Sequence, residues 1–227
     1  MDSKILRNEN EVKTDPETFI CANTEVMAPP HVPEIRLHLA SEAHDLWLKT
    51  EDELEEIGLP PPFWAFAWAG GQGLARYLLD HPETVAGRRV LDFASGSGLV
   101  AIAARIAGAA EVTAADIDPW SEKAVGLNAM NNDVQIAFVG DDLIGSTVDA
   151  DVVLAGDVFY DRDFAERLVP WFKALAGQGI EVLVGDPGRA YLPRDYLVCC
   201  AVYEVAVTRA LEDSEVKKTT VWKFAAG

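Results

Sequence analysis

The chain has 227 residues and a mass of 24.7 kDa, which fits one large domain or one domain with an appendage. Apolar residues make up 49% and charged residues 25%, so a disordered, collagen-like or low-complexity protein is excluded. Asp and Glu number 37 against 19 for Lys and Arg. The resulting net charge of −18 would repel a phosphate backbone, so we expect no nucleic-acid partner.

The sequence contains no run of 18 apolar residues, and we therefore expect no membrane-spanning helix. Residues 1–17 mix acidic and basic side chains without an apolar segment, which is not typical of a secretory signal or a transit peptide. The three cysteines and four histidines show no spacing typical of a disulfide framework or a zinc site. We therefore expect no bound metal.

Residues 1–62 lack regular alternation and are punctuated by prolines. We interpret them as an N-terminal cap and residues 63–227 as the main domain. Within the cap, residues 41–57 are strongly acidic and carry apolar residues at helical spacing. We expect this stretch to be a solvated helix face; the alternative is an acidic wall beside a cationic substrate.

From residue 88 onward, short apolar runs alternate with segments of helical length. Five runs predict strands, at residues 89–93, 111–116, 134–139, 151–156 and 180–185. Helices are predicted to begin near residues 98, 119, 163 and 189. This alternation is typical of a parallel sheet covered on both faces. Runs at 203–209 and 219–224 predict a closing antiparallel hairpin. We predict a Rossmann-like α/β fold: a seven-stranded, mostly parallel sheet with the last strand antiparallel and helices on both faces.

A loop of small residues follows the first predicted strand, in the sequence VLDFASGSGLV at residues 90–100. Residues without large side chains let the backbone turn sharply and a ligand approach closely, and the next helix begins with free N–H groups. Ligands of open α/β sheets bind at the carboxyl ends of the strands. We therefore predict a nucleotide-type cofactor site that includes Ala94, Ser95, Gly96 and Gly98.

The kind of cofactor depends on two acids. Asp116 lies 20 residues after Gly96, and this spacing suits a nicotinamide dinucleotide as well as other adenosyl cofactors. Asp92, at the strand end, would repel a pyrophosphate and attract an ammonium group. S-adenosylmethionine carries an ammonium and a sulfonium and no phosphate, and the chain is too short for a further substrate domain. We predict S-adenosylmethionine, with a nicotinamide cofactor as the alternative.

The motif AADIDP at residues 114–119 follows the second predicted strand. We expect Asp116 to accept hydrogen bonds from both ribose hydroxyls and Ile117 to pack on the adenine face. Asp118 is expected to be the N-cap of the next helix. After the third strand, Asp141 or Asp142 is expected to accept a hydrogen bond from the adenine amino group, and we favour Asp141.

The motif AGDVFYD at residues 155–161 follows the fourth predicted strand. A lysine ammonium, with a pKa near ~10.4, has no lone pair, so it must be held and lose a proton before it reacts. We predict that Asp157 holds this ammonium and that Tyr160 or Phe159 lines the alkyl stem or the sulfonium. The alternative for Asp157 is a cap of the next helix, for which Asp161 or Asp163 is better placed.

The stretch PPPFWAFAWAGGQG at residues 60–73 alternates large aromatic residues with alanine and then opens a helix with glycines. Most of these aromatic residues are expected in the core. Trp68 and the turn at Gly71 are predicted to border the cofactor, together with Gly156 at the end of the fourth strand.

Together, the loop, Asp116 and the DVFY element resemble class I, seven-β-strand S-adenosylmethionine-dependent methyltransferases that act on protein lysines. The stretches PPPFWAFAWAGGQ, GDVFYD and GDPGR are similar to the electron transfer flavoprotein β-subunit lysine methyltransferase family, over residues 18–225. The resemblance implies that Asp157 holds the target lysine with Tyr160 nearby. It also implies that the cofactor site is formed by Asp92, Gly96, Gly98 and Asp116.

The resemblance further implies a protein-lysine N-methyltransferase with the flavoprotein β-subunit as substrate and a ribosomal protein as a further candidate. Residue 94 departs from the family, whose loop usually has its first glycine there. The family works in mitochondria, and since no transit peptide is seen we expect a bacterial, cytoplasmic protein. We also expect a monomer. The alternatives are a small-molecule or other protein methyltransferase, an NAD-dependent oxidoreductase and an inactive binding module.

Overall fold

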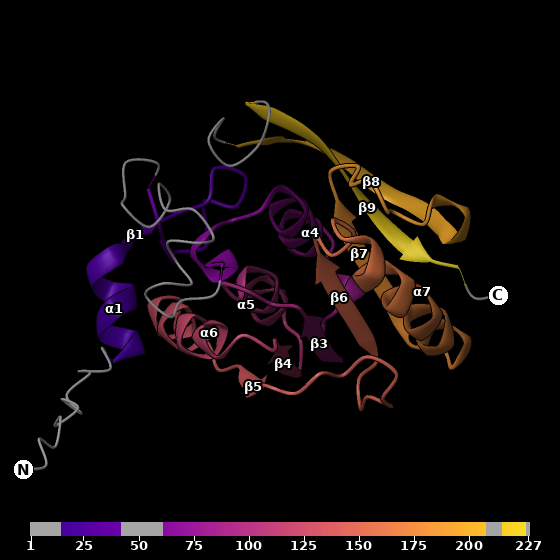
Figure 1. The fold of residues 1–227 in the computed structure, drawn as a ribbon, viewed down its shortest axis with the longest axis horizontal. Helices are drawn as coiled ribbons and strands as arrows, with labels where there is room; N and C mark the ends of the chain where they lie inside the picture. The colour runs from indigo at the N-terminus through magenta and orange to yellow at the C-terminus, as the bar shows by residue number, and fades with distance from the viewer. Residues whose placement is uncertain (1–14, 42–60, 208–214, 226–227) are drawn as a thin grey trace, which may run out of the picture.

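A seven-stranded sheet forms the centre of the protein, here described from a computed structural model that covers residues 15–41, 61–207 and 215–225 (Figure 1). The strand order is β5-β4-β3-β6-β7-β9-β8. Five strands pair in parallel: β3 (Arg89–Phe93), β4 (Glu111–Ala115), β5 (Ala137–Val139), β6 (Val152–Gly156) and β7 (Glu181–Asp186). The last strand, β9 (Val216–Phe224), lies antiparallel between β7 and the edge strand β8 (Leu197–Ala206), so the predicted fold is confirmed.

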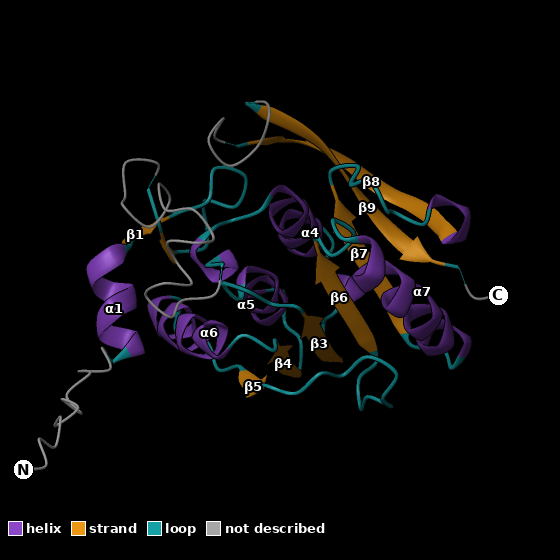
Figure 2. Ribbon diagram, in the orientation of Figure 1, coloured by secondary structure: helices purple, strands orange, loops and turns teal. Residues whose placement is uncertain are grey.

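Helices cover both faces of the sheet (Figure 2). Successive strand residues point to opposite faces, so Val90 packs with helices α4 (Ala69–Asp80) and α5 (Leu99–Ile106), whereas Leu91 packs with α7 (Arg162–Gly177). Helix α6 (Pro119–Asn131) adds Val125 to the first of these cores. Strands buried on both faces read as continuous apolar runs, which is why the sequence pattern located them.

The element boundaries follow local chemistry, with one exception. The carboxylates of Asp118 and Asp161 cap α6 and α7, as predicted. The helix predicted near residue 189 is wrong: the chain forms only the 3₁₀ turn η3 (Arg194–Tyr196) before β8. The Asp186 carboxylate accepts the amides of Gly188 and Arg189, and Pro193 supplies no N–H, so this segment cannot continue as a helix.

The described part of the N-terminal segment packs on the α5–α6 side of the sheet (Figure 1). It forms α1 (Pro16–Asn23) and an antiparallel pair, β1 (Glu25–Met27) and β2 (Leu37–Leu39). The Phe19 ring meets the Trp120 ring of α6 edge-on, at 5.2 Å between centroids. Leu37 is fully buried in the same core as α4 and α5. A domain boundary at residue 62 stays a prediction, and the acidic residues 42–57 lie outside the described ranges.

Among the helices of the described ranges, none has the length and apolar character needed to cross a bilayer.

Candidate active site

Glycines bring the start of α4 onto the carboxyl ends of β6 and β7. A Cβ atom on Gly70 would lie 2.3 Å from the carbonyl oxygen of Gly185, and one on Gly156 would lie 2.9 Å from Cα of Gly71. Side chains at these positions would collide with backbone, so the close approach requires glycine. It places the free amides of the α4 N-terminus over the loop that follows β6.

Asp157 lies at this junction and is 8% exposed. Its backbone is left-handed, with φ 57°, which is uncommon for a residue other than glycine and is found mostly at functional sites and tight turns. Its Oδ2 accepts hydrogen bonds from the amides of Gly70 and, at 3.3 Å, Gly71. Its Oδ1 accepts from Arg189, at 2.9 Å from Nε and 2.7 Å from Nη2.

An aromatic group borders the same carboxylate. The guanidinium carbon of Arg189 lies 5.9 Å from the centre of the Trp68 ring, within the range of a cation–π contact. Trp68 is fixed in turn, because its Nε1 donates to the carbonyl of Phe63 at 3.1 Å. Asp157 and Trp68 thus form a site for a cation, and Arg189 fills it.

Tyr160 lies three residues beyond Asp157 and is 52% exposed. Its ring is 5.9 Å from that of Phe63 and 6.2 Å from that of Phe164. Desolvation, followed by the charges of Asp161 and Asp116, raises the pKa of its hydroxyl, which therefore stays protonated at neutral pH. Phe159, the alternative aromatic group, is fully buried in the core and is not available to a ligand.

The glycine loop after β3 has the tight turn that the sequence predicted. Ala94, Gly96 and Gly98 all have positive φ, of 54°, 51° and 77°. Asp92 lies beneath this loop and is 1% exposed, and its Oδ2 accepts the amide of Ala101 in the first turn of α5, at 2.9 Å. Burial raises the pKa of Asp92 to about 8.

Asp116 joins this loop to the end of β4. Its Oδ2 accepts the Gly96 amide at 2.8 Å and its Oδ1 accepts the Asp118 amide at 3.0 Å. The neighbouring Ile117 side chain is 72% exposed and therefore open to a ligand. An acid and an exposed apolar group stand side by side, as the ribose and adenine of an adenosyl cofactor require.

The two acids after β5 differ in their surroundings. Asp142 is committed to the protein: its Oδ1 accepts the Ile144 amide at 3.0 Å and its Oδ2 pairs with Arg167 at 2.5 Å. Asp141 is exposed beside it. This difference leaves Asp141 as the better candidate for the adenine amino group.

The residues present fit S-adenosylmethionine. The buried Oγ of Ser95 has no hydrogen-bond partner within the described residues, and a buried hydroxyl without a partner is rare unless a ligand or water completes it. A Cβ atom on Gly71 would meet the Leu99 and Val100 side chains at 3.9 Å, an ordinary contact distance, so the space on that side of the residue admits a ligand. Over the described ranges, no cluster of three His, Cys, Asp or Glu side chains is suited to a metal ion.

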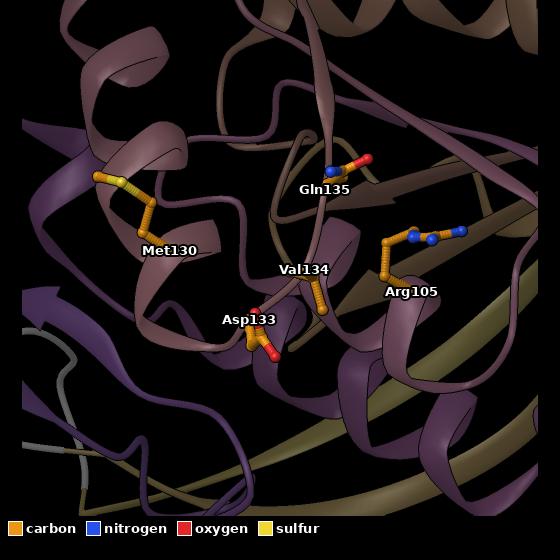
Figure 3. Close-up of a pocket in the computed structure, with 5 residues that line it drawn as sticks. All are labelled: Arg105, Met130, Asp133, Val134 and Gln135. Atoms are coloured by element: carbon orange, nitrogen blue, oxygen red, sulfur yellow. The ribbon is translucent and has the colours of Figure 1, made fainter.

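A separate hollow lies on the side of the sheet where the strands begin, opposite to the predicted site (Figure 3). It is lined by Arg105, Met130, Asp133, Val134 and Gln135. These residues come from the ends of α5 and α6 and from the segment that leads into β5, so they surround the amino ends of the strands. The predicted site residues surround the carboxyl ends, and none of them lines this hollow.

Two residues with central positions were missed by sequence reasoning. Arg189 belongs to the GDPGR stretch, but nothing in its local spacing indicates that it meets Asp157, 32 residues away. Asn128 is fully buried and donates to the carbonyl of Ser97 at 2.8 Å. A signal for Asn128 did exist, because it follows Ser121, Ala124 and Val125 on the buried face of α6, where a polar residue requires partners.

Known proteins share the fold of this chain. The model of the ribosomal protein L11 methyltransferase (PrmA) family matches residues 77–158, from α4 to the loop after β6. The crystal structure of Thermoplasma acidophilum 1320 superposes with a TM-score of 0.52 at 18% identity, covering 67% of this chain and 88% of that one. Magnesium protoporphyrin IX methyltransferase from Synechocystis, solved with bound S-adenosylmethionine, gives 0.50 at 13% identity, with coverage of 69% and 80%. The likeness to these two structures is one of fold.

Relatives at higher identity share nearly the whole chain. The electron transfer flavoprotein β-subunit lysine methyltransferase of Xenopus laevis is 38% identical over 97% of this chain and 91% of its own length. Those of Danio rerio and Homo sapiens are 40% and 36% identical, each over 92% of this chain and 83% of their own length. The chain belongs to the electron transfer flavoprotein β-subunit lysine methyltransferase family, as its motifs predicted.

These relatives also correct one prediction. We expected a bacterial, cytoplasmic protein, but the three relatives just described, which match more than nine-tenths of the chain, are vertebrate enzymes. The bacterial ribosomal protein L11 methyltransferases of Porphyromonas gingivalis and Symbiobacterium thermophilum match only 26% and 40% of the chain. Absence of a recognisable transit peptide was therefore a misleading guide to the origin of the chain.

Proposed function

We propose that this enzyme transfers methyl groups from S-adenosylmethionine to lysine side chains of the electron transfer flavoprotein β-subunit. The observation that carries the proposal is the site formed by the Asp157 carboxylate and the Trp68 ring, which holds a cation beside the predicted cofactor loop. Relatives that share most of the chain bear the name of this substrate. The nicotinamide alternative has no support among them.

The proposed site residues divide by position into those that face the target amine and those that hold the cofactor. Asp157 and Tyr160 face the target amine. The adenosyl half of the cofactor is held by the carboxylate of Asp116, the side chain of Ile117 and the carboxylate of Asp141, with the turn formed by Ala94, Ser95, Gly96 and Gly98. The amino-acid half lies near Trp68, Gly71, Asp92 and Gly156.

The main task of the protein in this reaction is to position the target amine. Bound S-adenosylmethionine provides a methyl group made electrophilic by its positively charged sulfur. Asp157 attracts the lysine ammonium and fixes its direction, while desolvation of the bound amine lowers its pKa against the opposing effect of the carboxylate and of the Trp68 and Tyr160 rings. The proton leaves to solvent, and the nitrogen lone pair is then held in line with the methyl group.

We also propose that residues 1–62 act as a cap on a methyltransferase domain of residues 63–227, and that the enzyme works as a monomer without nucleic acid or membrane. The net charge of −18 supports a protein partner with a basic surface around the target lysine.

The test is transfer of labelled methyl groups from S-adenosylmethionine to the purified flavoprotein, followed by intact-mass analysis of the β-subunit. Asp157→Ala is expected to abolish transfer, while S-adenosylhomocysteine binding stays measurable by calorimetry. Asp161→Ala is the matched control, because it removes an exposed capping acid four residues further on. Full activity of Asp157→Ala would reject the role given to this residue.

A ribosomal protein is a second candidate substrate, favoured by the family model that matches residues 77–158. That segment contains the glycine loop, Asp116 and Asp157 but neither Trp68 nor Tyr160, so the match covers only part of the proposed amine site. The same assay with ribosomal protein L11 in place of the flavoprotein distinguishes the two substrates.

A further inference from the structure

The carboxylate proposed to bind the target lysine is already fully occupied. A carboxylate accepts about four hydrogen bonds in all. Asp157 accepts two at Oδ2, from the amides of Gly70 and Gly71, and two at Oδ1, from Nε and Nη2 of Arg189. An incoming ammonium therefore finds an acceptor on Asp157 only after one of these donors has left.

Arg189 is the donor that is able to leave. The two amides belong to the first turn of α4, whose start is pressed against the backbone of Gly185 with no room for a Cβ atom. They move only if the helix moves. Arg189 reaches Asp157 through a long side chain that is 21% exposed and that comes from the loop between β7 and η3.

The loop keeps its shape when that side chain moves. The Asp186 carboxylate, 1% exposed, accepts the Gly188 amide at 2.6 Å and the Arg189 amide at 2.7 Å, so the backbone is anchored independently of Asp157. The second oxygen of Asp186 is buried and has no hydrogen-bond partner among the described residues. A rotation of the Arg189 side chain thus needs no change in the backbone around it.

The site that Arg189 fills has the chemistry of an ammonium site. It combines the carboxylate of Asp157, at 2.7 Å from Nη2, with the face of Trp68, at 5.9 Å from the guanidinium carbon. Carboxylates and indole rings bind lysine ammonium and its methylated forms as they bind guanidinium. The protein's own cation and the substrate's cation therefore compete for one place.

We propose that Arg189 is a specificity-determining residue, whose guanidinium stands in the place of the target ammonium until a substrate displaces it. The inference rests on the proposed role of Asp157. A tethered guanidinium competes at a high effective concentration, so free lysine and short peptides, which bring little more than an ammonium, enter poorly. A folded substrate that also contacts the exposed part of this loop, at Ala190 and Tyr191, gains enough binding energy to displace it.

The test uses n-butylamine as a mimic of the lysine side chain, with S-adenosylhomocysteine present. Arg189→Ala is expected to bind n-butylammonium at least ten-fold more tightly than the wild type. Arg189→Lys is the matched control and is expected to bind as weakly as the wild type, because it keeps an internal cation. In the wild type, the NMR signal of Arg189 Nε–H is expected to shift as n-butylamine is added, since the guanidinium leaves Asp157.

Equal or weaker amine binding by Arg189→Ala would overturn the inference, as would a wild-type Nε–H signal that stays unchanged at amine saturation. The NMR measurement does not depend on the stability of any variant. Neither readout uses a protein substrate, so a flavoprotein that is not methylated would reject the proposed substrate alone. Adding Asp157→Asn to Arg189→Ala is expected to remove amine binding; binding that persists would reject the role of Asp157 and this inference with it.

Discussion

Asn128 Nδ2 donates a 2.8 Å hydrogen bond to the carbonyl oxygen of Ser97 in the glycine loop. The Oδ1 of the same side chain accepts the backbone amide of His38, in β2, at 2.7 Å. Asn128 is completely buried. One amide group therefore links the N-terminal strand pair, α6 and the predicted cofactor loop, so the order of that loop depends on how the N-terminal segment packs.

Asn128→Ala is expected to leave the Ser97 carbonyl and the His38 amide buried without partners. Each unsatisfied group costs about 1–3 kcal/mol, so we expect a loss of roughly 2–4 kcal/mol in the free energy of unfolding. We also expect weaker S-adenosylhomocysteine binding, because the loop is no longer held. Urea denaturation and calorimetry measure the two effects.

Asn132→Ala provides the control for this prediction. Asn132 lies one turn further along and exchanges a similar pair of hydrogen bonds with Arg36, whose amide and carbonyl lie at 2.9 and 2.7 Å. It does not contact the glycine loop, and these bonds are exposed. We expect a smaller loss of stability and unchanged cofactor affinity. Equal affinity losses in both variants would show that the loop does not depend on Asn128.

Gly185→Ala is expected to separate α4 from the sheet. Its Cβ atom would lie 2.1 Å from the carbonyl oxygen of Gly70. Because this oxygen belongs to the backbone and not to a flexible side chain, the α4 N-terminus must shift. Overpacking of this kind costs typically about 1–3 kcal/mol, and here it also moves the amides that Asp157 accepts. We expect a lower melting temperature and loss of methyl transfer.

Gly126→Ala is the matched substitution, in the interior of α6, where no atom of the described residues outside the surrounding helix backbone lies within 4 Å of the new Cβ. There alanine replaces glycine in a helix, which is expected to raise the free energy of unfolding by about 1 kcal/mol. Activity is expected to stay unchanged. A similar destabilisation at both positions would contradict the claim that close backbone approach determines the effect at residue 185.

Contacts between near neighbours in sequence were predictable, and those between distant segments were not. Asp118 caps α6 through a bond to Trp120, two residues away, and such local chemistry is visible in the order of residues. The pair Asp157 and Arg189 forms only because β6 and β7 are neighbours with their carboxyl ends together. A correct list of strands does not say which side chains meet at the carboxyl ends of β6 and β7. The ion pair between Asp157 and Arg189 was therefore not predicted.

Ala94 shows a second limit of sequence reasoning. This alanine stands where the family's loop usually has a glycine, and its φ is 54°, in the left-handed region. Alanine is the smallest residue with a Cβ, and the surrounding turn holds it there at a cost of about 1–2 kcal/mol. Small size allowed the substitution, but composition alone does not indicate that the backbone is strained.

Ala94→Gly is therefore expected to stabilise the protein. Relief of the left-handed strain exceeds the added chain entropy of glycine, so we expect a net gain of about 0.5–1 kcal/mol in the free energy of unfolding. The control is Asp133→Gly, at an exposed residue with φ 53° beyond the end of α6. A similar gain is expected there, without any change in cofactor affinity. Destabilisation of Ala94→Gly would show that the alanine methyl group makes a contact worth more than the strain.

The buried Asp92 carboxyl makes the free energy of unfolding depend on pH. In the unfolded chain its carboxyl has the ordinary value of 3.8, whereas burial in the folded protein raises the pKa to about 8. Between these values the folded state holds a proton that the unfolded state has released. The free energy of unfolding therefore falls as the pH rises through this window, and the contribution is constant above it.

Asp92→Asn is expected to remove this contribution while keeping an oxygen that accepts the Ala101 amide. Urea denaturation at pH 5, 6, 7 and 8 is expected to show a variant that gains stability over the wild type step by step. Asp118, whose pKa burial raises to about 6, changes stability in the same direction but is present in both proteins, so it cancels in the difference. Parallel stability curves would mean that Asp92 is ionised in the folded protein, and that water or a cation reaches it beneath the glycine loop.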